Sequence, residues 1–104
     1  MTAKIEVTSL IGTPFCVASE DGARLYDAIF EQLKANQPVE VSFLGVTRLT
    51  TAFLNAGIGQ AYNEFAEDHI RNYLRVSNID EKGTSLLRQV VERAKIFFAG
   101  RKKP

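Results

Sequence analysis

The segment that most constrains the fold is residues 39–55, which combine a short strand pattern, a turn and the start of an apolar helix. Apolar and polar residues alternate over the first five positions, which is typical of a strand with one buried face. Gly45 lies in the turn, and Thr50 and Thr51 stand at the predicted start of the helix. Because strands joined through helices run parallel, this segment predicts a sheet with parallel strands and helices packed on it.

The remainder of the chain supplies the other elements of a small α/β fold. A turn signal at residues 12–14 separates two short apolar stretches, and this brief connection predicts an antiparallel hairpin. Ser19 and two acidic residues mark a helix start, and Pro38 marks the end of that helix. The element order ββαβαβα predicts a mixed sheet of about four strands with packed helices. The predicted strands cover residues 5–11, 15–18, 39–43 and 72–77, and the predicted helices cover residues 19–35, 51–67 and 84–100.

Length and composition favour one globular domain. The 104 residues suffice for one hydrophobic core, so we expect a single domain over residues 1–104 with a solvated basic tail at 101–104. A net charge of +1 favours neither nucleic acid nor a membrane as a partner. No apolar run reaches the roughly 20 residues of a membrane span, and residues 1–6 lack a secretion signal. With a single cysteine, these features predict a cytoplasmic protein.

Signatures of catalysis are weak throughout the chain. His69 follows two acidic residues and has no second metal ligand at a suitable spacing, which favours a surface histidine. Cys16 lies in an apolar stretch, where a buried, inert thiol is expected. Gly57 and Gly59 lie inside a predicted helix and lack the lysine and hydroxyl residue that complete a phosphate loop. We therefore expect no enzyme activity, no metal ion and no cofactor.

The chemistry that remains is the pair of hydroxyl groups at the start of the second predicted helix. Thr51 or Thr50 can cap this helix, and a cap of this kind typically contributes about 1 kcal/mol. An exposed Thr51 hydroxyl can also accept a phosphate, whose roughly two negative charges the helix dipole tolerates. A partner protein that docks over the helix start would be repelled by that charge. Both explanations stay open at this point.

The same segment resembles a known family. Residues 41–46, residues 49–55 and Gly59 resemble the STAS-like family of small bacterial domains with no assigned function. In that family a strand that ends in an acidic or polar residue followed by Phe-x-Gly-Val leads to a hydroxyl-rich helix start with Phe and Leu. The resemblance extends more loosely from the helix at Gly22 to Asn78, and it implies a STAS-like α/β fold.

More distantly, the chain resembles the STAS domain of bacterial anti-sigma-factor antagonists, whose strand–helix junction reads Asp-Ser-Ser-Gly-Leu-Gly. In those proteins an anti-sigma-factor kinase phosphorylates the first serine in a partner-switching cycle. The resemblance places Thr51 at that serine, with Ala52 at the next serine and Leu54 at the leucine. Thr50 replaces the aspartate and Phe53 replaces the glycine, so kinase recognition and partner contact depart from the family pattern here.

The resemblance implies a non-enzymatic regulatory module that binds another protein, an ATP-binding regulator of the kinase or ATPase type. The alternative hypothesis is a domain that binds a small ligand, a nucleotide or another anion, at the same helix N-terminus. A third hypothesis, an enzyme that uses Cys16 as nucleophile, has less support from the residues. The predicted interaction surface spans residues 45–55, with site residues Gly45, Thr50, Thr51, Ala52, Phe53 and Asn55.

Overall fold

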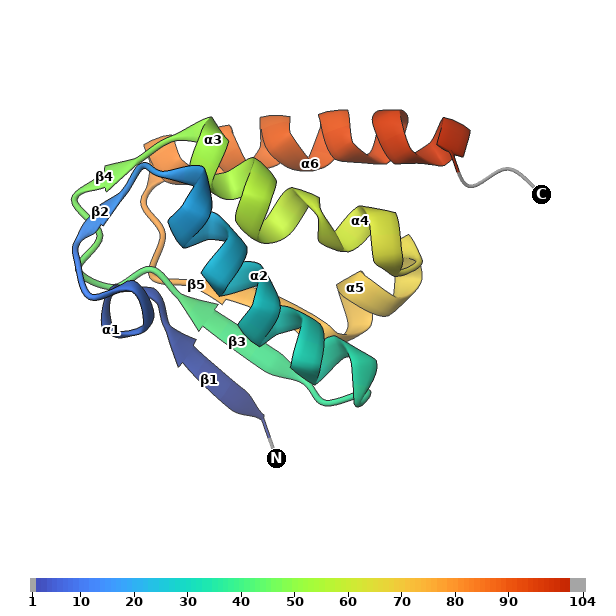
Figure 1. Cartoon of the computed structure of the whole chain (residues 1–104), viewed down its shortest axis with the longest axis horizontal. Coiled ribbons are helices and arrows are strands. Elements are labelled where there is room, and N and C mark those ends of the chain that lie inside the picture. Colours follow the sequence, from blue (N-terminus) through green and yellow to red (C-terminus); the bar gives the residue numbers. More distant parts are fainter. Residues whose placement is uncertain (1, 102–104) are drawn as a thin grey trace.

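The computed structural model describes residues 2–101 of the chain and the side chains of residues 2–99. Its main sheet has the strand order β1-β3-β5 and consists of β1 (Ala3–Glu6), β3 (Val39–Ser42) and β5 (Leu74–Ser77) (Figure 1). Both neighbouring pairs are parallel, and Val41 in the central strand lies between Ile5 and Val76. The predicted α/β class and the parallel pairing of strands joined through helices are confirmed.

The helices form successive layers beside this sheet. α2 (Ser19–Lys34) contacts β3, and a segment made of α3 (Thr51–Leu54), η1 (Asn55–Gly59) and α4 (Ala61–Glu64) packs on α2 through α3 and η1. The long helix α6 (Glu81–Arg101) packs on that segment and lies on the side away from the three-stranded sheet (Figure 1). The α3–α4 segment is therefore enclosed between two helices.

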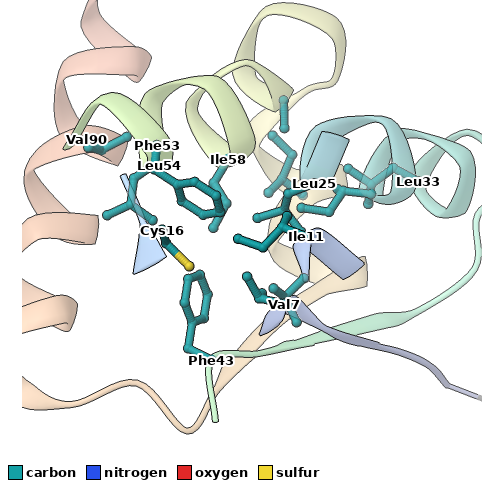
Figure 2. Close-up of a cluster of buried hydrophobic side chains, with 14 residues drawn as sticks. Val7, Ile11, Cys16, Leu25, Leu33, Phe43, Phe53, Leu54, Ile58 and Val90 are labelled. Atoms are coloured by element: carbon teal, nitrogen blue, oxygen red, sulfur yellow. The ribbon is translucent and has the colours of Figure 1, made fainter. Parts of the chain in front are cut away.

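Buried apolar side chains from these layers form a hydrophobic cluster (Figure 2). Leu25, Ile29 and Leu33 of α2 follow helical spacing and are fully buried, as the periodicity predicted. Val41 of β3 is fully buried opposite them, while its polar neighbour Glu40 is half-buried. The other buried members of the cluster are Val7, Ile11, Cys16, Phe43, Phe53, Leu54, Ile58, Ala61, Ile70 and Val90.

The predicted antiparallel hairpin and four-stranded mixed sheet are wrong. β2 (Phe15–Cys16) does not join the three-stranded sheet and instead pairs in parallel with β4 (Arg48–Leu49). The Thr50 N–H extends this pairing by donating to the carbonyl of Cys16 at 3.1 Å. The partners of β2 are thus more than thirty positions away in the sequence. The short turn before β2, from which the hairpin was predicted, does not indicate which strand β2 pairs with.

Residues predicted as the end of the first strand form a short helix, α1 (Val7–Ile11). Val7 and Ile11 lie four residues apart and are both buried. Because a strand and a helix both place such a pair on one face, apolar spacing did not distinguish the two structures. Gly12 ends the helix with a left-handed φ of +78°, and its N–H donates to the carbonyl of Thr8 at 2.9 Å.

The predicted helix at residues 51–67 is divided. It passes through the π-helical segment η1 and ends after α4, where the backbone becomes extended at Phe65. A separate helix, α5 (Glu67–Tyr73), follows and leads directly into β5. α6 begins at Glu81, three residues before the predicted start at position 84.

The last described residue, Arg101, ends α6. Residues 102–104 of the predicted basic tail lie outside the described residues. Across residues 2–101, no helix is long and apolar enough to cross a membrane.

Candidate functional site

The loop that follows β3 is anchored by the buried hydroxyl of Ser42. Its oxygen accepts hydrogen bonds from the Asn78 side-chain amide at 2.9 Å and from the Leu44 N–H at 3.3 Å. The Phe43 N–H donates to the carbonyl of Ser77 at 2.9 Å. These bonds hold the loop after β3 beside the residues that follow β5.

The turn in this loop depends on Gly45. Its φ of +85° lies in the left-handed region, which glycine adopts without a steric penalty. The Val46 N–H donates to the carbonyl of Phe43 at 3.1 Å and closes the turn. Gly45 is exposed, so the structure places this predicted site residue at the surface.

Thr50, and not Thr51, caps the helix. The Thr50 Oγ1 accepts a hydrogen bond from the Phe53 N–H at 3.2 Å and donates one to the carbonyl of Val17 at 3.0 Å. The Leu54 N–H donates to the Thr50 carbonyl at 3.2 Å. Thr50 therefore joins the start of α3 to the chain after β2. The N–H groups of Phe53 and Leu54 in the first turn are therefore already bonded. The hypothesis that an anion binds at this helix start stays a prediction.

The Thr51 hydroxyl makes none of these bonds. Across the described residues it has no hydrogen-bond partner, and it is not among the buried polar atoms that lack one, so its oxygen reaches the surface. Ala52 and Asn55, one helical turn apart, are exposed. Phe53 is fully buried between them, so its inclusion in the predicted surface is wrong. The helical turn that exposes positions 52 and 55 directs position 53 into the core.

Three exposed apolar side chains lie near the helix start, and sequence reasoning missed them. Phe15 and Val17 flank the buried Cys16 and are 50% and 40% exposed, and Leu44 in the loop after β3 is 61% exposed. The alternation around Cys16 indicated a strand with an outward face. Only the tertiary structure brings this strand beside Thr50, whose hydroxyl bonds to it.

An open pocket of about 570 Å³ lies at the loop after β3, and Leu44 and Gly45 of this loop line it. The residues that follow β5 and the first turns of α6 complete it. The ends of β3 and β5 lie at the carboxyl edge of the main sheet (Figure 1), where α/β proteins commonly bind ligands. Thr50 lines the pocket, whereas Thr51 and Ala52 do not. The other lining residues are Phe43, Leu44, Gly45, Val46, Thr47, Arg48, Leu49, Asn78, Ile79, Asp80, Lys82, Gly83 and Leu86.

Cys16 is fully buried, as predicted. Burial, and to a lesser extent the nearby charge of Asp21, raise the pKa of its thiol from 9.0 to about 11. The thiol is therefore protonated at neutral pH, which is the less nucleophilic form.

The predicted surface histidine, His69, is half-buried. Its Nε2 lies 2.8 Å from the carbonyl of Leu33 at the end of α2. Its ring stacks on Phe65 with a centroid distance of 5.4 Å and contacts Tyr73 at 4.8 Å. Among the described residues, no group of three or more His, Cys, Asp and Glu side chains could hold a metal ion.

Comparison with known proteins identifies the family to which the chain belongs. A family model described as a STAS-like domain of unknown function (DUF4325) matches residues 21–84, which is more than half of the chain. The chain belongs to this family. No curated protein and no solved structure matches it.

The matched region of this STAS-like domain contains the loop after β3, the start of α3 and most of the pocket. The exposed residues Phe15 and Val17 precede the matched region. The family assignment therefore covers the helix start and most of the pocket, and it does not extend to Phe15 and Val17.

Proposed function

We propose that this STAS-like domain is a non-enzymatic regulatory module that binds another protein over the start of α3. The observation that carries the proposal is the accessible, unbonded hydroxyl of Thr51, which follows a cap residue bonded to the backbone of the exposed Val17. Phe15, Val17 and Leu44 offer a partner an apolar surface of the kind that protein interfaces bury. Gly45, Ala52 and Asn55 extend this surface along the loop and the helix.

Thr51 is the proposed phosphate acceptor. A phosphate would add about 1.5 to 2 negative charges in the first turn of the helix, where the helix dipole favours negative charge. Because Thr50 supplies the cap, modification of Thr51 leaves the bonds to Phe53 and Val17 in place. The fold would then survive, while a partner surface that covers the helix start would have to bury the new charge.

The proposed partner is an ATP-binding regulator of the kinase or ATPase type. The support is the resemblance of the strand–helix junction to anti-sigma-factor antagonists, in which such a partner also phosphorylates the site. Two residues depart from that pattern: Thr50 forms the helix cap, and Phe53 lies in the core. Neither change affects the accessible hydroxyl oxygen of Thr51. We also propose a cytoplasmic location, where ATP is available to this partner.

The test combines partner capture with charge substitution. Immobilised domain is used to capture ATP-binding proteins from the native host, and the captured protein is purified and titrated calorimetrically against wild type, Thr51→Ala and Thr51→Glu. Ser85→Glu, which adds the same charge on the exposed face of α6, is the matched control. Mass spectrometry of the native protein searches for phosphothreonine at position 51.

We expect wild type, Thr51→Ala and Ser85→Glu to bind alike and Thr51→Glu to bind at least about tenfold more weakly, a cost of about 1.4 kcal/mol. Circular dichroism should show the same melting temperature for all four proteins. Equal affinity of Thr51→Glu and Ser85→Glu would rule out a switch at Thr51. Failure of Phe15→Ser and Leu44→Ser to weaken binding would remove the apolar surface from the proposed interface.

A further inference from the structure

The pocket beside the loop after β3 combines apolar walls with uncompensated positive charge. Two cationic residues, Arg48 and Lys82, line it from opposite segments of the chain. Within the described residues, neither forms an ion pair or a side-chain hydrogen bond. The apolar lining residues are Phe43, Leu44, Val46, Leu49, Ile79 and Leu86.

The one acidic group among the lining residues is already engaged. The Asp80 Oδ1 accepts a hydrogen bond from the Gly83 N–H at 2.7 Å in the first turn of α6. This carboxylate caps the helix and forms no ion pair with Arg48 or Lys82 within the described residues, so two cations and one carboxylate leave the lining with a net positive charge. The Gly83 and Thr84 N–H groups at the start of α6 are already bonded to Asp80, and the negative charge of Asp80 would repel a multiply charged phosphate chain more strongly than a single carboxylate.

We propose that this pocket binds a small organic anion with an apolar body, such as a medium-chain carboxylate. The apolar body lies against the walls, and the single negative charge pairs with Arg48 and Lys82. A volume of about 570 Å³ is within the usual range for small-molecule sites. Thr51 and Ala52 do not line the pocket, although Leu44 and Gly45 of the proposed interface do, so ligand binding does not require the proposed phosphate acceptor.

The test uses decanoate as the probe and follows backbone amide shifts of the full chain by NMR, with affinities from calorimetry. Decanol supplies the same apolar body without the charge, acetate supplies the charge without the body, and ATP represents a polyphosphate. Arg48→Gln with Lys82→Gln removes the cations. Arg75→Gln, an exposed cation on β5 that does not line the pocket, is the matched control.

We expect saturable one-site binding of decanoate, with shifts in residues 43–50 and 78–86. The double variant should bind at least tenfold more weakly, and Arg75→Gln should bind like wild type. Decanol should bind at least tenfold more weakly than decanoate, and acetate should not saturate. Any one of three results would overturn the proposal. Decanoate could fail to saturate the protein at millimolar concentration, it could shift the amide signals of other residues, or it could bind the double variant as tightly as wild type. Tighter binding of ATP than of decanoate would overturn the ligand class.

Discussion

A Cβ atom at Gly22 of α2 would lie 2.5 Å from the carbonyl oxygen of Phe53 in α3. It would also lie 2.9 Å from the Ala56 Cβ. α2 and α3 thus approach each other closely because position 22 has no side chain. This close contact sets how near the start of α3, which carries the candidate interaction surface, lies to α2. Gly57 lies at the same crossing, since a Cβ there would approach a Leu25 methyl group at 3.0 Å.

Gly22→Ala should destabilise the domain by about 1–3 kcal/mol in urea unfolding, because backbone at 2.5 Å must move apart. The gain in helix propensity from alanine, about 1 kcal/mol, offsets only part of a clash of this size. Ala23→Ser on the exposed face of the same helix should change the stability by less than about 0.5 kcal/mol. A Gly22→Ala variant as stable as wild type would show that the helices separate at little cost.

Thr50→Ala should cost about 1 kcal/mol, because it removes the cap on the Phe53 N–H and the donor to the Val17 carbonyl. Thr50→Ser keeps both bonds and should retain most of the stability. Thr51→Ala removes no hydrogen bond among the described residues and should be nearly neutral. Thermal unfolding of the three variants checks this order, and a larger loss for Thr51→Ala than for Thr50→Ala would contradict the assignment of the cap.

Stability should fall as the pH rises from about 9 towards 11, because Cys16 ionises more readily in the unfolded chain than in the folded protein. Below pH 9 the thiol is protonated in both states, so Cys16 contributes no pH dependence there. Between the two pKa values, Cys16 lowers the free energy of unfolding by up to about 1.4 kcal/mol for each unit of pH increase. Cys16→Ala should lack this contribution despite its lower overall stability. Burial also raises the pKa of Tyr26, to about 12, and that of Tyr62, and both add a loss as the pH approaches 10. Comparing wild type with Cys16→Ala by urea unfolding between about pH 8.5 and 9.5 therefore isolates the thiol.

Lys95→Gln should raise the pKa of Glu67 towards 4.5. The hydrogen bond from the Lys95 Nζ, 2.9 Å from the Glu67 Oε2, is the largest cause of the lowered pKa of this carboxyl group. The salt bridge with Arg71 at 3.1 Å contributes less, so Arg71→Gln should raise the pKa by a smaller amount. NMR titration of the Glu67 side chain measures both. Because the folded pKa is lowered, the stabilisation is present above pH 4.5 and is lost as the pH falls through the folded pKa.

The elements that followed from the sequence are those whose signal is local. The apolar stripe of Leu25, Ile29 and Leu33 predicted a buried helix face, and the alternation around Val41 predicted a strand with a buried side. A capping threonine at position 50 or 51 was predicted because its partner, the N–H of Phe53, is three residues away. The family followed from residues that are contiguous around this same strand and helix start.

The predictions that were wrong concern elements whose partners are distant in the chain. The strand at Phe15 and Cys16 was recognised, but its pairing with Arg48 and Leu49 was not, because no local pattern encodes the partner of a short strand. The division of the helix at residues 51–67 was likewise not predicted; it includes the π-helical segment η1, in which Gly57 packs close to Leu25 of α2.

By itself, the sequence determined the α/β class, the parallel crossovers, the family and the segment that carries the candidate site, because periodicity and capping act over a few residues. Only the tertiary structure decided which hydroxyl at the start of α3 is used and which is left accessible. The Thr50 hydroxyl donates to a carbonyl 33 positions earlier in the chain, at Val17, and this bond commits one threonine to the fold. The pocket with Arg48 and Lys82 arises for the same reason, since it exists only where the ends of β3 and β5 meet.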